Sequence, residues 1–256
     1  MKTLAIGSVA LLAIGLAGPA AFAADMPARP LPPPIVVANW TGCYVGLFIG
    51  TASGKAKVDR YANVDGTNGG EDANYNLSGM LGGADAGCDY QVGAWVFGIL
   101  GDWAVTNKDG QQIDVITKTG LGTPVIDQTH ERWIATARAR LGYAITDKWL
   151  WYVTGGGAWI SAQQSKWVQG VPQLTGIGTN TLSGWTAGLG TEYMLGYGWS
   201  IKSEFLYVDV GSKQFFGPGA NGTLVPTYPG QDVKIKDYIF TFGMNYRFGW
   251  VGGARY

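Results

Sequence analysis

The residues in this sequence that could do chemistry are acids and bases inside runs that otherwise read as apolar β-strands. Glu192 and Glu204 are a carboxylate pair of the kind that can perform general acid–base catalysis. Arg138, Arg140 and Lys202 occur in runs of the same character. Because bases accompany the acids, ion pairing explains the carboxylates better than catalysis, and we expect the protein not to be an enzyme.

Metal and cofactor chemistry find little support in the sequence. The only histidine, His130, lies where a polar segment meets a strand-like run, and it could bind haem or a metal ion. An isolated histidine is usually only solvated, and no set of His, Cys and acidic residues has the spacing of metal ligands. We therefore predict neither a cofactor nor a metal site.

The composition is unusual for a soluble domain. Only 14% of the 256 residues are charged, against about 25% in soluble domains, and the chain has 41 glycines, 11 tryptophans and 13 tyrosines. The 18 basic residues balance 18 acidic ones without a basic cluster along the sequence, which argues against nucleic acid as a partner. Many glycines and aromatics with few charges are typical of a membrane barrel with interfacial aromatic girdles.

The last strand-like run carries the clearest pattern. From Phe240 to Phe248 every second residue is aromatic or methionine, while the residues between them are small or polar and include Arg247. A period of two indicates a strand with one apolar and one polar face. An aromatic face opposite an arginine suits a barrel with lipid outside and a polar lumen.

Eight such runs follow one another, separated alternately by tight breaks and by segments of about twenty residues. Each run is long enough to cross a membrane, for which about 9–11 residues suffice. Short turns at one end and long loops at the other are typical of outer-membrane barrels. We therefore predict an all-β fold, an eight-stranded antiparallel up-and-down transmembrane β-barrel with four long extracellular loops. Its strands are predicted at Trp40–Ser53, Asn76–Gln91, Ala94–Thr106, Gln128–Ile145, Lys148–Gln164, Thr181–Gly196, Gly198–Ser212 and Val233–Phe248.

The alternation also decides which face of each strand is inside. An Arg or Lys that faces lipid at the membrane midplane costs about 2–4 kcal/mol, so the charged faces must line the lumen. The interior of an eight-stranded barrel is only just wide enough for its side chains. We therefore predict a salt-bridged plug, most of it in one layer of the periplasmic half, rather than a transport path. The predicted lumen charge cluster comprises Asp85, Asp89, Asp102, Arg138, Arg140, Glu192, Lys202, Glu204 and Arg247.

The N-terminus has the features of a cleavable export signal. These are Lys2, the apolar run Leu4–Ala17 and the small residues Ala21 and Ala23. We divide the chain into a signal peptide (1–23), a Pro-rich periplasmic segment (24–39), an outer-membrane β-barrel (40–248) and a C-terminal extension (249–256).

Export would place Cys43 and Cys88 in an oxidising compartment, and we predict that they form a disulfide. Cys43 lies three residues above the start of the first strand, and Cys88 three residues above the end of its antiparallel neighbour. Both have the parity of the lipid-facing residues. Equal height and a shared face allow the Cβ separation of about 3.5–4.5 Å that a disulfide needs. A stagger between the two strands would instead leave the cysteines apart.

Several motifs resemble those of the small outer-membrane β-barrels of alphaproteobacteria, often called porin-family proteins, of the OmpA-like barrel superfamily. They include Trp40-Thr-Gly-Cys-Tyr-Val-Gly46, Arg138-Ala-Arg-Leu-Gly-Tyr143, Gly184-Trp-Thr-Ala-Gly188 and Asn245-Tyr-Arg-Phe248. The resemblance covers all eight predicted strands but not the loops. It implies a location in the cell outer membrane, in contact with lipid and lipopolysaccharide, and leaves the partner of the loops open.

The end of the last strand also resembles the closing signal of bacterial outer-membrane barrels. Thr241, Gly243, Tyr246 and Phe248 occupy its polar, glycine and aromatic positions. The resemblance implies that the barrel-assembly machinery recognises this strand and closes the barrel with it. Eight further residues follow the usual terminal phenylalanine.

These observations predict a mainly structural role in envelope integrity, with at most slow passage of small solutes. Two alternatives remain open. A diffusion porin would have an open, water-filled lumen. A haemin- or host-surface-binding barrel would act through its extracellular loops, with aromatic residues and histidine converging among them.

Overall fold

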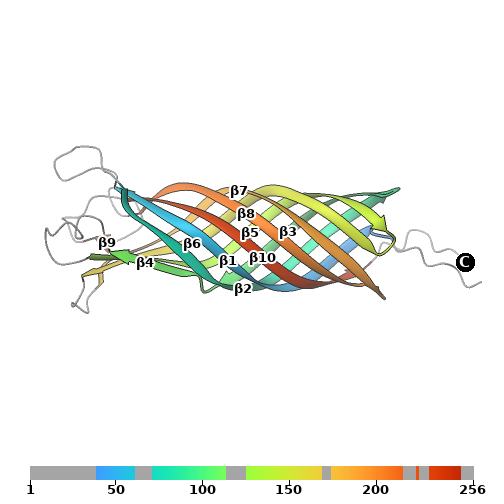
Figure 1. Cartoon of the computed structure of the whole chain (residues 1–256), viewed down its shortest axis with the longest axis horizontal. Helices are drawn as coiled ribbons and strands as arrows, with labels where there is room; N and C mark the ends of the chain where they lie inside the picture. The colour runs from blue at the N-terminus through green and yellow to red at the C-terminus, as the bar shows by residue number, and fades with distance from the viewer. Residues whose placement is uncertain are drawn as a thin grey trace, which may run out of the picture. The chain divides into compact units, whose positions relative to one another are not determined.

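The computed structural model describes residues 39–60, 71–113, 125–168, 174–215, 223–224 and 231–248. The predicted signal peptide, all of the Pro-rich segment except Asn39, and the C-terminal extension lie outside these residues. No helix among the described residues is long and apolar enough to cross a membrane. The described strands (Figure 1) are β1 (Gly42–Arg60), β2 (Glu71–Val92), β3 (Trp95–Thr106), β4 (Asp109–Ile113), β5 (Val125–Thr146), β6 (Trp149–Val168), β7 (Leu174–Gly196), β8 (Trp199–Phe215), β9 (Thr223–Leu224) and β10 (Gln231–Phe248).

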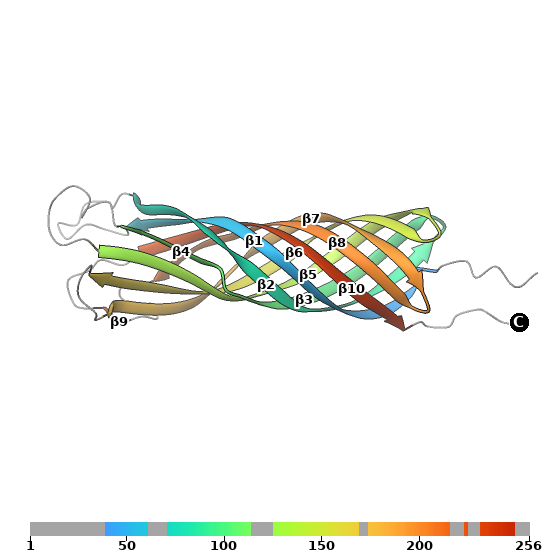
Figure 2. The same cartoon turned by 60° about the horizontal axis from the view of Figure 1, so that its bottom comes forward.

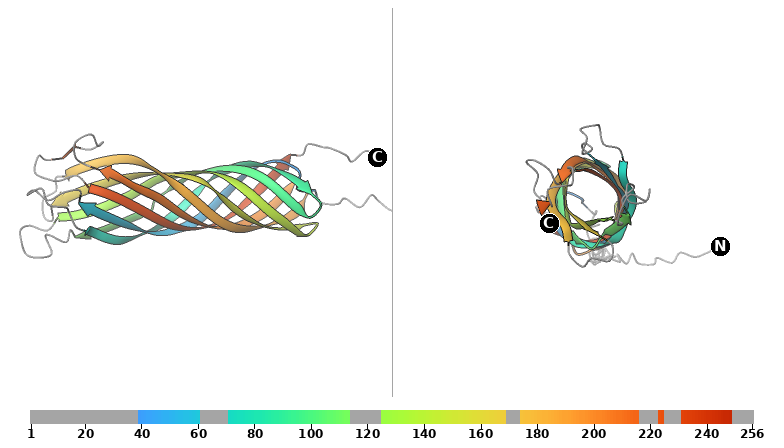
Figure 3. Two further views of the ribbon diagram at one scale, coloured as in Figure 1. Left: turned by 90° about the horizontal axis from the view of Figure 1, so that it is seen from above. Right: turned by 90° about the vertical axis from the view of Figure 1, so that its left-hand side faces the viewer.

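Eight of these strands form a closed ring in which every neighbouring pair is antiparallel (Figure 2). The order around the ring is β1-β10-β8-β7-β6-β5-β3-β2, and β2 pairs back with β1. The end-on view in Figure 3 shows the ring closed around its axis. The prediction of an eight-stranded antiparallel barrel is therefore confirmed. β4 and β9 are short additions that pair with β5 and β7.

Several strands run farther toward the extracellular end than predicted. β1 continues to Arg60 instead of ending at Ser53. Ala56 and Val58 are buried in the barrel, whereas Lys55 and Lys57, which alternate with them, are exposed. The composition of this stretch is that of a loop, but its period of two keeps an apolar row on the inner face. Burial of this apolar row in the barrel explains why the strand continues.

β4 corrects the predicted loop between residues 107 and 127. It pairs with β5 from Asp109 opposite His130 to Ile113 opposite Ile126, so this polar stretch extends the barrel wall. Between β3 and β4 the chain bulges at Lys108, whose carbonyl accepts the backbone N–H of Glu131 at 2.9 Å. The bulge places the Lys108 side chain in the lumen, fully buried.

The outer surface carries an apolar band between two aromatic girdles. The tight turns at Gly93, Asp147 and Tyr197 mark the periplasmic end, as short turns do in outer-membrane barrels. On β10 the band runs from Phe248 to Tyr238. Ten residue steps make about 33 Å of strand, and at a tilt of about 40° they span the roughly 25 Å of such a band. The inner girdle comprises Tyr90, Trp95, Tyr143, Trp149, Tyr193, Trp199 and Tyr246, and the outer girdle comprises Trp103, Trp159, Trp185 and Tyr238.

Cys43 and Cys88 lie directly opposite each other on β1 and β2. They form a disulfide with an S–S distance of 2.06 Å, on the face that also exposes Val45 and Tyr90 to lipid. The predicted disulfide is confirmed, and the two strands are in the register on which the prediction depended.

This arrangement predicts that denatured, non-reduced protein shows no titratable thiol. The Cys43→Ala/Cys88→Ala variant should still fold, because the β1–β2 ladder continues to Asp59 opposite Glu71. It should lose its folded band at a lower temperature on a semi-native gel, because closing a loop of 45 residues contributes about 4 kcal/mol in the chain-entropy account. Two titratable thiols in the wild-type protein would contradict the arrangement.

Deleting Tyr246–Tyr256 should abolish membrane assembly, whereas deleting Gly249–Tyr256 should not. The longer deletion removes Tyr246, which pairs with both Val45 of β1 and Trp199 of β8 at the seam that closes the ring. The shorter one leaves every described pair intact. The measurement is the heat-modifiable folded band in outer-membrane fractions. If the protein that lacks only Gly249–Tyr256 did not assemble, the closing signal would be at Tyr256 and not at Phe248.

Candidate functional site: the ionic core of the lumen

All nine residues of the predicted lumen charge cluster point into the barrel, and each forms an ion pair. They fall into two groups along the barrel axis. Arg138 lies two residues farther from the periplasmic turn of β5 than Arg140 does, and their partners follow the same order. The central group comprises Arg138, Asp102, Glu204, Lys202 and Asp85, and the periplasmic group comprises Arg140, Arg247, Asp89 and Glu192.

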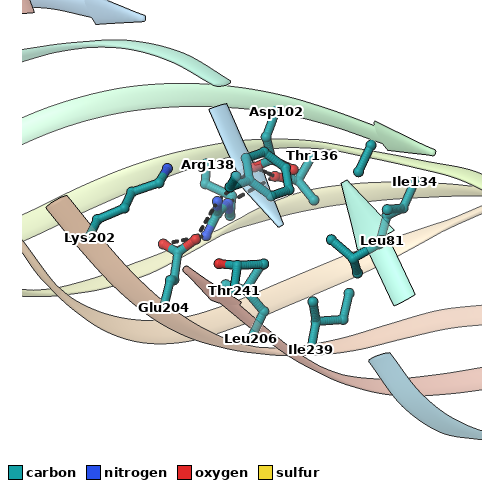
Figure 4. A pocket seen from close by; sticks show the side chains of 12 residues that line it. Leu81, Asp102, Ile134, Thr136, Arg138, Lys202, Glu204, Leu206, Ile239 and Thr241 are labelled. Atoms are coloured by element: carbon teal, nitrogen blue, oxygen red, sulfur yellow. Dashed lines mark hydrogen bonds and ion pairs between the residues drawn. The ribbon is translucent and has the colours of Figure 1, made fainter. Parts of the chain in front are cut away.

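Arg138 is the centre of the central group. Its guanidinium donates to both oxygens of Glu204, at 2.9 and 3.0 Å, and to Asp102 Oδ2 at 2.6 Å. It also donates to the hydroxyls of Thr136, at 2.9 Å, and Thr154, at 3.0 Å. All five N–H donors of an arginine are thereby used. Figure 4 shows this guanidinium held between the two carboxylates.

Lys202 forms the second ion pair of the central group. Its Nζ donates to Asp85 Oδ2 at 2.7 Å and lies 5.5 Å from the centre of the Phe48 ring. Lys202 and Arg138 therefore face three carboxylates, those of Asp85, Asp102 and Glu204. The central group contains one more acid than base, and its ion pairs are almost completely shielded from solvent.

In the periplasmic group each arginine contacts both carboxylates. Arg140 lies 2.5 Å from Glu192 Oε2 and 3.4 Å from Asp89 Oδ2. Arg247 lies 3.0 Å from Asp89 Oδ2 and 3.6 Å from Glu192 Oε1. Ser200 donates a further hydrogen bond to Glu192 at 2.5 Å. Two positive and two negative charges therefore balance within one hydrogen-bonded layer.

Aromatic rings enclose this layer, and the predicted charge cluster does not include them. The guanidinium carbon of Arg140 lies 3.8 Å from the centre of the Tyr152 ring, and that of Arg247 lies 4.9 Å from the centre of the Tyr44 ring. Such cation–π contacts contribute about 2 kcal/mol when they are desolvated. Arg247 also donates to the backbone carbonyl of Trp40 at 2.6 Å, which ties the last strand to the segment before β1. Strand parity could have identified both tyrosines, because each shares a face with small or polar residues.

Beyond the central group the lumen becomes apolar, which corrects the prediction of a polar lumen. Figure 4 shows Leu81, Ile134, Leu206 and Ile239 beside the cavity next to Arg138. Farther out the core continues through the buried residues Leu77, Ile160, Leu182, Val208, Val210, Val233 and Ile235. Strand parity carries this signal too, because Leu206 and Val208 follow Glu204 on the inner face of β8.

A third ionic group, here called the outer triad, lies still farther toward the extracellular end. Lys108 Nζ lies 2.7 Å from Glu131 Oε1 and also pairs with Asp237, and all three side chains are buried. Glu131 lies beyond Trp133, outside the membrane-spanning part of β5. Burial, together with the neighbouring Asp237 carboxylate, raises the pKa of Glu131 to about 8, against the attraction of Lys108. Glu131 therefore holds its proton to a higher pH than an ordinary glutamate does.

The outer triad could not be predicted from the sequence, because it depends on two irregularities in the strands, a register shift and a bulge. Counted along the predicted strand, Glu131 has the outward parity of Trp133 and Ala135. A register shift between Glu131 and Trp133 turns it inward, and Lys108 belongs to the bulge opposite this shift. Simple alternation fails at such a bulge because one strand contains an extra residue.

The remaining sequence predictions fall at three places. Half-exposed His130 pairs with Asp109 at 2.5 Å, and the described part of the chain has no group of three or more His, Cys, Asp or Glu that could hold a metal ion. Thr241 and Gly243 face the lumen, and a Cβ on Gly243 would lie 2.8 Å from the carbonyl oxygen of Leu47. Tyr246 and Phe248 face lipid.

The outer triad predicts a pH dependence of stability. Because the folded-state pKa of Glu131 is about 8, against 4.5 for an ordinary glutamate, the unfolded chain loses its proton first. Its contribution to stability is full below pH 4.5 and is lost as the pH rises toward 8. Glu131→Gln should remove this decline between pH 5 and 8 in gel-monitored melting temperatures. If the melting temperatures of the wild type and of Glu131→Gln changed with pH in the same way, the raised pKa of Glu131 would be contradicted.

Comparison with known proteins agrees with this geometry. Residues 8–248 match the family described as outer membrane protein beta-barrel domain. The 31 kDa outer-membrane immunogenic protein of Brucella melitensis is 29% identical over 252 residues, covering 97% of this chain and 100% of that protein. The 25 kDa outer-membrane immunogenic protein of the same species is 29% identical over 257 residues, covering 97% of this chain and 99% of that protein.

Among solved structures, OprG of Pseudomonas aeruginosa is similar with a TM-score of 0.49 and 14% identity, covering 82% of this chain and 97% of that one. The bilayer structure of AlkL gives a TM-score of 0.46 and 14% identity, covering 84% of this chain and 94% of that one. The family match spans the whole barrel and agrees with the closed ring, the lipid-facing band and the aromatic girdles. The chain belongs to the outer membrane protein β-barrel family and is an outer-membrane protein.

Proposed function

We propose that this protein is a closed structural barrel that stabilises the outer membrane, with at most slow passage of small solutes. The observation that carries the proposal is the filling of the lumen along its length. From the periplasm outward, the described side chains form the periplasmic group, the central group, the apolar section and the outer triad. The cavity between the central group and the apolar section has a volume of about 10 Å³, which is room for about one water molecule.

The ionic groups are better suited to holding strands together than to passing ions. Arg138 on β5 connects Asp102 on β3 with Glu204 on β8, so it joins distant parts of the wall. A permeating ion would have to break hydrogen bonds that use all five donors of this guanidinium. Removing one member of a buried pair leaves its partner uncompensated, at a cost of about 3–5 kcal/mol.

The apolar section adds a second barrier, of a different kind. A charged or strongly polar solute passing Leu206, Val208 and Ile235 would lose its hydration without gaining hydrogen bonds, which costs several kcal/mol for each polar group. This favours the closed barrel over a diffusion porin. Haemin or host-surface binding would use the segments between the strands, most of which lie outside the described residues.

The proposal is tested by changing the central group and measuring stability and conductance together. Arg138→Ala leaves two carboxylates without their cation, so we expect it to lower the free energy of unfolding by about 3–5 kcal/mol. Glu204→Ala should cost less, because Arg138 still binds Asp102 at 2.6 Å. Exposed Arg132 on the outer face of β5 provides the control, and Arg132→Ala should leave stability unchanged.

Planar bilayers then separate the closed barrel from the pore. Wild-type protein should give no large, stable conductance steps. The Arg138→Ala variant should lose its folded band at a lower temperature than the wild type, without a change in ion selectivity. A porin would behave in the opposite way. A large wild-type conductance whose ion selectivity changes in Arg138→Ala or Glu204→Ala, at unchanged thermal stability, would overturn the proposal.

A further inference from the structure

Four lysines gather on the outer face where β1 meets β10. The register places Lys55 directly opposite Lys236, and Lys57 directly opposite Lys234. Lys55 and Lys57 come from near the start of the barrel and Lys234 and Lys236 from its last strand, so no cluster is visible along the sequence. We call these four residues the lysine patch.

The pairing of like charges in the lysine patch requires a counter-charge. Like charges directly opposite each other on neighbouring strands destabilise a sheet. Asp209 of β8 lies 3.3 Å from Lys236 and 3.9 Å from Lys234, and Lys57 lies 3.2 Å from Asp59. Lys55 has no ion-pair partner within the described part of the chain.

Acids surround the patch without neutralising it. Asp209 lies at its β8 edge, and Asp59 opposite Asp232 forms the next row toward the extracellular end. The row of Asp59 and Asp232 continues on β2 with Glu71, opposite Asp59. The side chains of Lys57, Lys234 and Lys236 remain 44–48% exposed. The two lysine rows nearest the membrane contain no acid on β1 or β10. They present a concentrated positive surface to whatever lies beside them.

The height of the patch indicates what lies beside it. Lys236 and Lys234 follow the outer-girdle residue Tyr238 by two and four positions on the same face of β10. At about 3.3 Å per residue and a tilt of about 40°, they lie roughly 5–10 Å outside the apolar band. This is the headgroup zone of the outer leaflet. Directly below the patch, Tyr238 and Phe240 of β10 present apolar rings to the lipid tails, beside the exposed Ser53 and Thr51 of β1.

The patch is confined to one side of the barrel. Above Trp185 the outward residues of β7 are Ser183, Thr181 and Thr179, which are uncharged. A general need for polar residues outside the membrane would be met by such side chains all round the ring. The restriction of paired lysines to β1 and β10 therefore indicates a localised anionic partner.

We propose that the lysine patch docks the phosphate groups of outer-leaflet lipids. Charge complementarity, headgroup height and continuity with an apolar strip all fit one molecule that carries both acyl chains and phosphate. A soluble anion would use the lysines but not the apolar strip below them. The occupant is thus a phosphorylated lipid, held beside the seam where the last strand closes the ring.

The experiment uses the full-length refolded protein in zwitterionic detergent, with added phosphatidic acid as the phosphate-bearing lipid. Diacylglycerol of the same acyl chains is the phosphate-free control, and inorganic phosphate is the chain-free control. Phosphatidic acid should raise the temperature at which the folded band disappears, because a ligand that binds only the folded state stabilises it. Diacylglycerol and inorganic phosphate should not.

Variants of equal charge then locate the effect. Lys55→Gln/Lys236→Gln removes one opposed pair, and Arg132→Gln/Lys148→Gln removes the same charge elsewhere on the exposed surface. Each lysine near an anionic surface strengthens binding about fivefold. The patch variant should therefore need at least about tenfold more phosphatidic acid for half of the shift, and the control variant should behave as the wild type. Without lipid the patch variant should differ little from the wild type in stability, because it loses the Lys55–Lys236 repulsion together with the exposed Lys236–Asp209 ion pair.

Each contrary result overturns the proposal. Equal stabilisation by inorganic phosphate would assign the patch to a free anion. If both variants lost the phosphatidic-acid shift to the same extent, the effect would be explained by the net charge of the protein and not by the patch. No shift of the wild type with phosphatidic acid would exclude lipid phosphate as the occupant, whether or not the variants fold. Lys55→Arg/Lys236→Arg keeps both positive charges and should retain the shift, and loss of the shift in this variant would overturn recognition of the phosphate by charge.

Discussion

The width of an eight-stranded ring is the constraint on which the rest of this structure depends. Such a ring leaves room only for the side chains it encloses, so every large inward residue needs a small neighbour. A Cβ on Gly190 would lie 2.5 Å from the Tyr152 ring, and one on Gly46 would lie 2.0 Å from Asn245 Oδ1. Glycines therefore make the space that Tyr152, Asn245 and their charged partners occupy. The ionic core and the high glycine content are two consequences of the same geometry.

In so narrow an interior, charges are stable only beside opposite charges, because a buried and uncompensated charge is costly. Arg138 meets this condition with two carboxylates and five hydrogen bonds. Arg140 and Arg247 meet it by sharing Asp89 and Glu192, although the Nε atom of each has no hydrogen-bond partner among the described residues. The lumen is therefore layered, with balanced charge toward the periplasm and an apolar core above it. Both layers oppose the passage of water and ions. This is why the site supports a structural role more strongly than transport.

The outer surface of the barrel faces lipid, unlike the inner surface, which faces the packed lumen. Between the girdles the side chains that face lipid are apolar. The disulfide of Cys43 and Cys88 is tolerated there because it is uncharged. Just beyond the outer girdle the solvent becomes the headgroup zone, and the lysine patch appears there. Strand β10 carries Arg247, with its ion pairs, on the inner face, and β1 and β10 together carry the patch on the outer face. The seam that closes the barrel thus carries contacts toward both the lumen and the membrane.

The sequence by itself determined the period of two, and with it the strand count, the inward charges and the face of both cysteines. Alternation is local, because successive side chains of a strand point to opposite faces. Only the tertiary structure decided what depends on register and bulges. One register shift turned Glu131 inward to meet Lys108, and the pairing of β1 with β10 brought Lys55 beside Lys236. Contacts between strands far apart in the chain depend on how the ring closes, and no local pattern specifies that.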